Sequence, residues 1–574
     1  MNVKINFEMC VKKLWLILWC LLGALFIVMC GNMKDLIVME FDYLISESFV
    51  FSFGLIFDSL SIGFVGCIML ISGSVFVYSI WYMDNEVFFK RFIFLVYLFV
   101  LSMMFMIMTC NLVSLLIGWD GLGLTSFLLV CYYQNNKSLS GAMLTALSNR
   151  VGDVFILFSI CFFMNEGGWS LYSYNSMMYM FYFCLIILFA GMTKSAQMPF
   201  VAWLPAAMAA PTPVSSLVHS STLVTAGVYL VLRSYGCLVH SPVSFLILKF
   251  LSIITLVLAG SSALSVVDLK KVVALSTLSQ LSVMMFSISI MLPFISFFHL
   301  VTHAVFKALL FLSAGCFIHS LLNCQDYRMI GSGWKLVPFT SVAMICANMS
   351  LCGVPFMSGF FSKDLIIEMS VMGGDVFFIY FMELLGFFFS SWYSMRIMMN
   401  VIFGESFYFV KHTKWSEPFE LKFSYFFLLC GAVMVGAVMK SKVVCFNEIA
   451  MIMNVDFVFF LFFWLYGLSA FFISLFIVSH FYKTMKINEF LGSVWWMENL
   501  SSQPFSYGVM NLSDSLVKVL DKGWLEFLGP QGLFYFGSLL SKHNQYNQSL
   551  FFLYSVSVMM IFVICCCMVM KILL

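Results

Sequence analysis

Long apolar runs, separated by short polar breaks, recur from one end of the chain to the other. About fifteen of these runs have the length, roughly 20 residues, that a helix needs to cross a hydrocarbon layer of about 30 Å. The pattern therefore predicts an all-α polytopic membrane protein. The expected membrane helices lie near residues 11–31, 57–82, 92–110, 111–133, 140–164, 177–198, 213–236, 243–264, 272–292, 296–320, 338–372, 375–403, 423–440, 456–482 and 550–573.

Two of the expected helices are interrupted, and each interruption contains a lysine. The first reads "KSAQMPF" and contains Lys194 and Pro199; the second reads "LCGVPFMSGFFSKD" and contains Pro355 and Lys363. Proline lacks the backbone donor that a helix uses. Irregular backbone at membrane depth is tolerated only inside protein or beside water. Both interruptions are therefore expected to line a hydrated cavity.

The two interrupted helices hold corresponding places in two groups of five helices, 111–236 and 243–372. Paired interruptions are typical of transporters built from internal repeats, whose binding sites lie near the middle of the membrane. The sequence thus favours two five-helix repeats, flanked by further membrane helices at 1–110 and 375–482.

The segment 507–548 has a different pattern from the rest of the chain. From Leu512 to Phe527 apolar residues recur at helical spacing, while carboxylates and lysines occupy the other side. This pattern predicts an amphipathic helix that lies along a surface, with an interruption near Gly529. The last apolar run, 550–574, is then expected to return to the membrane as an anchor.

Composition supports a membrane protein and narrows the chemistry. Of the 574 residues, 62% are hydrophobic and 10% are charged, whereas soluble proteins carry about 25% charged residues. The net charge of +2 gives no indication of nucleic-acid binding. The 18 cysteines show no spacing suited to zinc or an iron–sulfur cluster. No glycine-rich dinucleotide-binding motif is present either.

Lys194 is the only charged side chain between Glu166 and Arg233. An ionisable group in a membrane helix costs at least about 2.5 kcal/mol and normally faces the bundle interior or a water-filled cavity. A lysine that reaches to the membrane surface, or sits in a fixed ion pair, is the structural alternative. The neighbouring interruption favours a functional role, as does His219 among serines and threonines on the next helix.

A column of titratable residues lies in the expected helix 296–320. His299, His303 and Lys307 are spaced i, i+4 and i+8, which places them on one stripe of a helix. Imidazoles exchange protons near neutral pH, and a desolvated lysine releases its proton more readily than one in water. The column can therefore pass a proton between its members.

Acidic residues at three places can act as partners of these cations. Asp120 is isolated in its apolar run, Asp153 follows Arg150 at i+3, and Asp268 precedes Lys270. A carboxylate close to a lysine favours its charged form, and withdrawal of the carboxylate lets the lysine release a proton. The Arg150–Asp153 and Asp268–Lys270 pairs have an equally simple interpretation as fixed structural pairs near helix ends.

Six motifs occur along the chain in this order: "IGWDGLG", "NRVGD", "KSAQMPFVAWLPAAMAAPTPVSSLVHSSTLVTAG", "DLKKVVALSTLSQL", "HLVTHAVFKALLFLSAG" and "GVPFMSGFFSKD". Together they resemble the NADH dehydrogenase subunit 5 family, the distal antiporter-like subunits of mitochondrial respiratory complex I, over nearly the whole chain. The resemblance implies two inverted five-helix repeats and a lateral helix along neighbouring subunits. It also implies location in the mitochondrial inner membrane and proton translocation driven by distant electron transfer from NADH to ubiquinone.

The resemblance also implies roles for the buried residues. Asp120 corresponds to a channel carboxylate paired with Lys194, Lys307 to the central lysine and Lys363 to the lysine on the exit side. Asp120 stands where many members have glutamate, which shortens its reach towards Lys194. The relay histidines of the family correspond to His219, His299 and His303.

In this family the subunit itself holds no redox cofactor, and NADH, FMN, iron–sulfur clusters and ubiquinone bind to other subunits. The implied partners are other membrane-arm subunits of complex I, above all the adjacent antiporter-like subunit, together with lipid and protons. Two alternatives stay open. The long lateral segment argues against a stand-alone cation/proton antiporter, and the lysines at the interruptions argue against a purely structural cap on the membrane arm.

Overall fold

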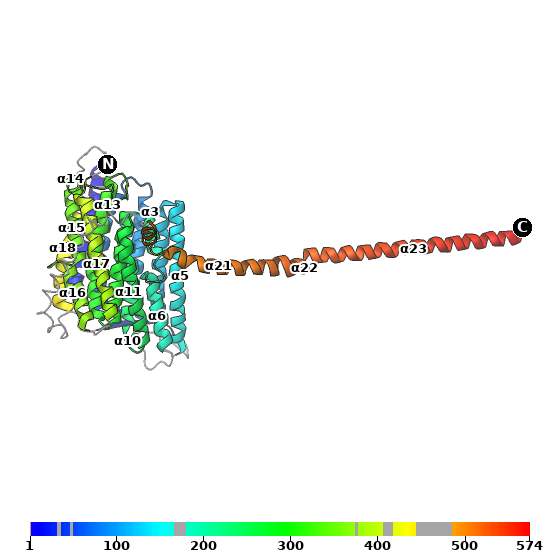
Figure 1. Ribbon diagram of the computed structural model, residues 1–574, viewed down its shortest axis with the longest axis horizontal. Helices are drawn as coiled ribbons and strands as arrows, with labels where there is room; N and C mark the ends of the chain where they lie inside the picture. The colour runs from blue at the N-terminus through cyan, green and yellow to red at the C-terminus, as the bar shows by residue number, and fades with distance from the viewer. Residues whose placement is uncertain are drawn as a thin grey trace. The chain divides into compact units, whose positions relative to one another are not determined.

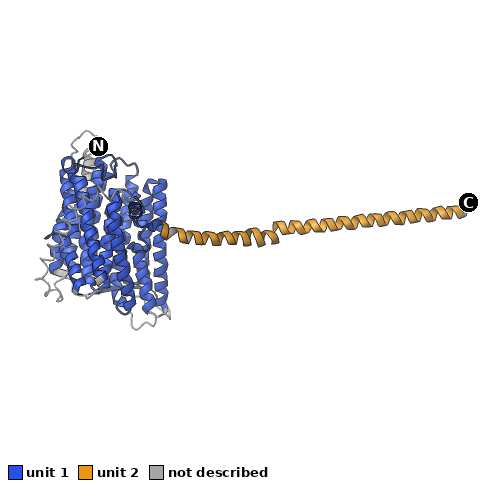
Figure 2. Cartoon of the chain, viewed as in Figure 1, with its two compact units in different colours: residues 1–498 blue, residues 499–574 orange. Residues whose placement is uncertain are grey.

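A computed structural model of the chain describes residues 2–30, 36–45, 50–165, 180–372, 377–405, 417–443 and 485–573. These residues divide into two compact units, 1–498 and 499–574, which are coloured separately in Figure 2. In the first unit most helices run side by side along one axis (Figure 1). The second unit is a run of helix.

The long helices of the first unit follow the predicted apolar runs closely. They are α1 (Asn2–Cys30), α2 (Ser59–Tyr82), α3 (Phe89–Met108), α4 (Leu112–Val130), α5 (Asn136–Asn165), α6 (Met180–Lys194), α9 (Leu223–Arg233), α11 (Pro242–Ser265), α12 (Leu269–Ser289), α13 (Pro293–Ser320), α15 (Pro338–Cys352), α16 (Ser358–Met372), α17 (Phe377–Ile397) and α18 (Phe419–Val443). Shorter helical pieces join them: η1 (Cys131–Tyr133), α7 (Trp203–Ala206), η2 (Ala207–Ala209), α8 (Thr212–Val214), η3 (Ser215–Thr222), α10 (Tyr235–Leu238), α14 (Gly333–Leu336), η4 (Met398–Phe403) and α20 (Met485–Gly492).

The predicted class, a helical polytopic membrane protein, is confirmed. Within the described residues, ten helices are long and apolar enough to cross a membrane, and three shorter apolar helices accompany them. The total of about fifteen membrane helices stays a prediction. The inverted orientation of the two five-helix groups stays a prediction as well. The expected helix 456–482 lies outside the described residues.

Both predicted interruptions are present. Helix α6 ends at Lys194, and the next helix, α7, begins only at Trp203. Helix α15 ends at Cys352 and α16 begins at Ser358. Gly353 follows α15 with a φ of +80°, a left-handed conformation that glycine adopts without the steric penalty of a side chain.

The expected helix 213–236 has a different form from the one its pattern predicts. Its first part, Ser215–Thr222, is a π-helix, and only from Leu223 does it continue as α9. In the π-helix, hydroxyls bond to main-chain carbonyls; Thr222 Oγ1, for example, donates to Leu217 O at 2.6 Å. Apolar spacing does not distinguish a π-helix of two turns from an α-helix, so hydropathy predicted a single element.

A β-hairpin precedes α2. Strands β1 (Ile37–Ile45) and β2 (Val50–Phe57) are antiparallel, with Ile37 opposite Phe57. The hydropathy pattern predicts no element at 37–56, because short apolar strands have neither the length of a membrane helix nor a strict alternation.

The centre of the first unit consists of helices that are buried on all sides. The most apolar windows of η3–α9, α12 and α13 are wholly buried, and that of α2 is 94% buried. By contrast, the corresponding windows of α3, α4, α5 and α18 are less than half buried. A helix that is apolar all round is stable when other helices surround it. The central helices therefore place their few polar residues where the surrounding protein, rather than lipid, meets them.

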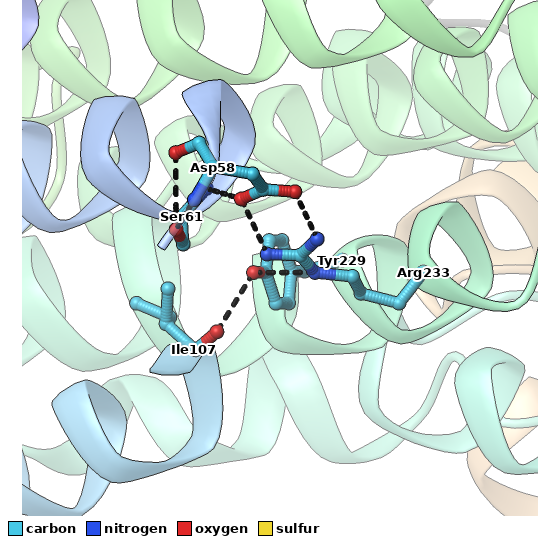
Figure 3. A network of polar contacts seen from close by, with 5 residues as sticks. All are labelled: Asp58, Ser61, Ile107, Tyr229 and Arg233. Atoms are coloured by element: carbon cyan, nitrogen blue, oxygen red, sulfur yellow. Dashed lines mark hydrogen bonds and ion pairs between the residues drawn. The ribbon is translucent and has the colours of Figure 1, made fainter. Parts of the chain in front are cut away.

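A buried ion pair ties the start of α2 to the end of α9 (Figure 3). Arg233 donates from Nη1 to Asp58 Oδ2 at 2.5 Å and from Nη2 to Asp58 Oδ1 at 2.9 Å. Its Nε donates to Tyr229 Oη at 2.7 Å, and that hydroxyl donates to Ile107 O at 2.9 Å. Asp58 also caps α2, because its Oδ1 accepts from the backbone N–H of Ser61.

The second unit contains all but the first two residues of α21 (Met497–Leu516), followed by the π-helix η5 (Val517–Leu525), α22 (Glu526–Leu528) and α23 (Pro530–Leu573). The predicted interruption near Gly529 is present, since α22 ends at Leu528 and α23 begins at Pro530. Lys518 and Asp514 form an i, i+4 ion pair of 3.0 Å on the polar side of the amphipathic stretch. Helix α23 continues through 548–550, so no helix break separates the predicted surface helix from the predicted anchor.

We predict that Asp58→Asn destabilises the protein by about 3 kcal/mol, because it leaves the buried guanidinium of Arg233 without its counter-ion. Thermal unfolding of the detergent-solubilised protein measures this effect. Asp326→Asn is the matched control, because Asp326 pairs with Arg328 in an exposed loop. Removing that pair should cost less than about 1 kcal/mol. Equal effects of the two substitutions would contradict the structural importance of the buried pair.

Candidate functional site

Lys194, at the end of α6, is fully buried. Its Nζ donates to the main-chain carbonyl of Trp119 on α4 at 2.8 Å, and lies 3.6 Å from the centre of the Trp119 ring. A carbonyl dipole and an aromatic face both attract an ammonium group. Trp119 thus provides the direct contacts of Lys194.

The carboxylates near Lys194 lie behind this tryptophan. Trp119 Nε1 donates to Asp153 Oδ1 at 2.8 Å. Arg150 Nη1 donates to Asp153 Oδ2 at 3.0 Å and lies 3.5 Å from Asp120 Oδ2. Asp153 is thus one hydrogen bond away from Trp119, the residue that binds Lys194. Asp120 is one contact further away, because it joins this group through its ion pair with Arg150.

This arrangement confirms one predicted contact and corrects another. The Arg150–Asp153 pair is present. The direct pairing expected between Asp120 and Lys194 is replaced by the pair of Asp120 with Arg150. Successive residues of an α-helix point about 100° apart. Because Trp119 faces Lys194, the next side chain along α4 turns towards Arg150 on α5.

His219 lies in the π-helix η3 and is 1% exposed. Its ring centre is 6.3 Å from that of Trp203. Within the described residues, neither of its ring nitrogens has a hydrogen-bond partner. A buried polar group without a protein partner carries a desolvation penalty that water or a passing proton carrier removes. His219 is therefore suited to a role in which its partner comes and goes.

The predicted column on α13 is buried throughout its length. His299 Nδ1 is 2.9 Å from Ser362 Oγ, and His299 Nε2 is 3.3 Å from Gln280 Oε1. The ring of His303 lies 6.3 Å from that of His299, centre to centre. Both nitrogens of His303 lack a partner among the described residues. In this column, both ring nitrogens of His299 have hydrogen-bond partners, whereas those of His303 have none among the described residues.

Lys307 completes the column and is also fully buried. Its Nζ donates to Ser276 Oγ on α12 at 2.6 Å. No carboxylate of the described residues lies within ion-pair distance of this ammonium group. Lys307 therefore depends on a neutral hydroxyl for its direct contact.

Lys363 lies in α16, just after the second interruption, in a setting similar to that of Lys194. Its Nζ donates to Leu351 O at 3.3 Å and to Ser390 Oγ at 2.9 Å, and lies 4.8 Å from the centre of the Phe387 ring. At both interruptions a lysine therefore meets a main-chain carbonyl and an aromatic ring. The carbonyl of Leu351 is near the end of α15, where the following turn frees such groups from the helix.

The predicted pair of Asp268 with Lys270 does not form. Asp268 Oδ2 lies 3.6 Å from Lys271 Nζ, and both side chains are about 40% exposed. Lys270 is buried, and its Nζ donates to Ala210 O at 3.2 Å. On a helix, positions i and i+3 share a face whereas i and i+2 do not. Asp268 and Lys271 thus form a surface pair, and Lys270 points into the bundle.

Several residues of the site were not among those predicted. Trp119 directly precedes Asp120 in the sequence, and Asp364, a buried carboxyl group, directly follows Lys363. Their position beside a predicted site residue was a usable signal. The polar partners on other helices gave no such signal: Ser276, Gln280, Ser362 and Ser390.

The chemistry available at this site is proton exchange. Lysines, imidazoles, carboxyl groups and hydroxyls all accept and release protons, and here the lysines of the two interruptions and the imidazoles are buried. Within the described part of the chain, no group of three or more His, Cys, Asp or Glu side chains is placed to hold a metal ion.

Family comparisons match most of the chain. Residues 109–390 match the transmembrane family of NADH:quinone oxidoreductase and Mrp antiporters. Residues 43–93 match the N-terminus of complex I NADH-ubiquinone oxidoreductase chain 5, and residues 393–572 match the C-terminus of NADH dehydrogenase subunit 5.

Individual relatives agree with these families. The chain is 50% identical to NADH-ubiquinone oxidoreductase chain 5 of Mytilus edulis over 95% of this chain and 96% of that protein. It is 42% identical to the protein of the same name from Locusta migratoria, over 85% of this chain and 87% of that protein. Its fold is similar to a chain of the Mrp complex from Dietzia sp. DQ12-45-1b, with a TM-score of 0.73 and 22% identity. That likeness covers 91% of this chain and 60% of the Mrp chain.

We predict that an amine-acylating reagent, applied to the folded protein in detergent, modifies Lys271 and spares Lys270. Lys271 is partly exposed in its pair with Asp268, whereas Lys270 is buried against Ala210. Mass spectrometry of the digested protein gives the modified fraction at each lysine. After denaturation both lysines should react equally. Equal reaction before denaturation would show that Lys270 is not buried.

Proposed function

This chain belongs to the NADH dehydrogenase subunit 5 family, and on that premise we propose that the buried residues of its two helix interruptions carry protons across the membrane. It is a proton-translocating membrane-arm subunit, and part of an NADH:ubiquinone oxidoreductase. The role of each individual residue in the proton path is part of this proposal.

One observation carries the assignment. Among the described residues, no carboxylate oxygen lies within ion-pair distance of Lys194, Lys307 or Lys363. Each ammonium group is instead bound by a carbonyl, a hydroxyl or an aromatic ring. A carboxylate as direct partner would hold the ammonium group in its charged form. Lysines without one are suited to gaining and losing a proton.

In the first half of the path, Arg150 acts as a switch on the charge of Lys194. Its guanidinium contacts both Asp120 and Asp153. A shift of Arg150 towards Asp120 leaves Asp153 free to attract the ammonium of Lys194, and the reverse shift weakens that attraction. Lys194 then holds its proton in one state and passes it towards His219 in the other. Trp119 keeps the lysine and the carboxylate at a fixed separation.

In the second half of the path, the proton moves along α13. It passes from Lys307 to His303 and His299, and through the hydroxyl of Ser362 to the neighbouring Lys363. The hydrogen bond between His299 and Ser362 supports this order. Both nitrogens of His303 have no hydrogen-bond partner among the described residues, so the imidazole can accept a proton from one neighbour and donate to another.

The alternative of a stand-alone cation/proton antiporter is not favoured. Sequence identity to chain 5 proteins reaches 50% over nearly the full chain, while the likeness to the Mrp complex, at 22% identity, shows the fold alone.

We further propose that the chain lies in the mitochondrial inner membrane, next to another antiporter-like subunit. The amphipathic part of the second unit supports a lateral helix along such neighbours, since its charges of both signs differ from the cationic face of a helix that binds lipid. NADH, FMN, iron–sulfur clusters and ubiquinone are assigned to other subunits. The absence of the corresponding sequence motifs from this chain supports that assignment.

We predict that Asp153→Asn lowers the number of protons translocated per NADH more strongly than Asp120→Asn, because Asp153 is the carboxylate that acts on Lys194. A loss of about 1.4 kcal/mol of interaction corresponds to a change of about tenfold in the proton affinity of the lysine. The measurement is acidification or alkalisation in vesicles that contain the assembled complex. Asp268→Asn, in the exposed pair with Lys271, is the control and should have no effect. A larger effect of Asp120→Asn would assign the direct role to Asp120.

We also predict that Lys363→Met and Lys307→Met each lower protons per NADH while the complex still assembles. Methionine keeps most of the side-chain length but cannot hold a proton, so the path is interrupted at one point. Native gels give the amount of assembled complex, and vesicle assays give the proton count. Lys271→Met serves as a lysine control outside the path. Normal proton counts in both path variants, at normal assembly, would refute the proposed function.

A further inference from the structure

A cluster of buried hydroxyl groups lies on α12 and α17, outside the path described above. Its members are Ser276, Ser279, Ser390, Tyr393 and Ser394, and none is more than 1% exposed. Cys352, at the end of α15, adds a thiol to this hydroxyl cluster. Buried hydroxyls in a membrane bundle commonly bond only to their own helix. Here several of them also contact a lysine or a residue of another helix.

The cluster begins at Lys307. The ammonium of Lys307 donates to Ser276 Oγ at 2.6 Å. Ser279 stands one turn further along α12, on the same face as Ser276. Its Oγ is 3.1 Å from Tyr393 Oη, so that this contact connects α12 to α17.

The cluster ends at Lys363. The ammonium of Lys363 donates to Ser390 Oγ at 2.9 Å. Ser394 follows one turn later on α17, and its Oγ is 2.8 Å from Cys352 Sγ. The thiol of Cys352 and the phenol of Tyr393 are thus joined to the residues that contact the two lysines through Ser394 and Ser279.

We propose that the hydroxyl cluster forms a second proton route between Lys307 and Lys363, one that contains no histidine and has the Tyr393 hydroxyl as its bridge. This inference rests on the proposed function, because it assigns a proton donor to one end and an acceptor to the other. The histidine column leaves Lys307 along α13. The hydroxyl route leaves the same lysine along α12 and reaches Lys363 from α17.

The transfer along this route is balanced at every atom. A hydroxyl both accepts and donates a hydrogen bond. When the Lys307 ammonium gives a proton to Ser276 Oγ, that oxygen releases the proton it held to the next acceptor, and each later oxygen does the same. The neutral amine of Lys363 takes up the last proton. Rotation of the hydroxyls then restores the starting orientation.

Three intervals of the route contain no direct hydrogen bond, and one of them separates Tyr393 from Ser390, which lies three residues earlier on α17. Side chains one helical turn apart, such as Ser276 and Ser279 or Ser390 and Ser394, have Cβ atoms about 5–6 Å apart. One water molecule bridges an interval of that size. No hydroxyl of the route stores a charge. The route therefore moves a proton only when Lys307 is protonated and Lys363 is neutral, whereas a histidine can hold a proton in between.

The test is Tyr393→Phe in the assembled complex, alone and together with His303→Gln. Tyr393→Phe removes the bridging hydroxyl and keeps the ring. Tyr425→Phe is the matched control, because Tyr425 is equally buried and its hydroxyl bonds to Leu312 O, away from the route. The readout is protons translocated per NADH oxidised, a ratio that a change in the amount of assembled complex does not alter.

We expect Tyr393→Phe alone to lower the ratio by up to about twofold, since one of two routes remains. We expect this ratio to fall in the double variant by a factor far larger than the product of the factors for the two single variants. Such a result is expected when two routes run in parallel. Tyr425→Phe should leave the ratio unchanged, both in the otherwise unaltered protein and in the His303→Gln variant. A ratio in the double variant equal to that of His303→Gln alone would overturn the second route. Complete loss of translocation in His303→Gln alone would also overturn it, because the hydroxyls would then carry no protons by themselves.

Substitutions of Ser279 provide an independent check if Tyr393→Phe impairs folding. Ser279→Ala should repeat the result of Tyr393→Phe, while Ser279→Thr keeps a hydroxyl and should restore translocation in the His303→Gln background. Equal ratios for the alanine and threonine variants would overturn the route. Normal ratios in every variant, His303→Gln included, would instead refute the proposed function of the histidine column.

Discussion

The structure depends on how an ammonium group is held where no solvent reaches it. Burying an unpaired charge is expensive, and pairing it permanently with a carboxylate would fix its proton in place. The contacts of Lys194 and Lys363 lie between these two extremes. Each meets a main-chain carbonyl and an aromatic ring. These contacts offset part of the desolvation without supplying a full negative charge, so the lysine remains able to change its protonation state.

The backbone is arranged to make this solution possible. An unbroken α-helix uses its carbonyls internally, and only its last turn leaves them available. At the second interruption, Gly353 ends α15 in a left-handed conformation and leaves the carbonyl of Leu351 within reach of Lys363. The π-helix around His219 is another departure from regular backbone beside a buried titratable residue. These two irregular segments thus lie beside buried titratable residues, where surrounding helices exclude lipid.

The remainder of the first unit keeps this interior closed. The buried pair of Arg233 with Asp58 joins the end of α9 to the start of α2, two of the central helices. Peripheral helices such as α3 and α5 expose much of their apolar surface, as expected for helices whose outer face meets lipid. The lysines and histidines of the proposed proton path are enclosed in this way, whereas Arg150 and Asp120, on the peripheral helices α5 and α4, have side chains that are 53% and 35% exposed.

The sequence by itself determined the membrane class, the two interruptions and the column on α13, because each depends on composition or on spacing within one helix. It could not determine which residues meet across helices. Spacing fixes how side chains are arranged around a helix axis but not how that axis is rotated against its neighbours. Only the tertiary structure therefore turned Asp120 towards Arg150, separated Lys270 from Asp268 and brought Tyr393 to α12, because each contact depends on the packing of helices distant in sequence.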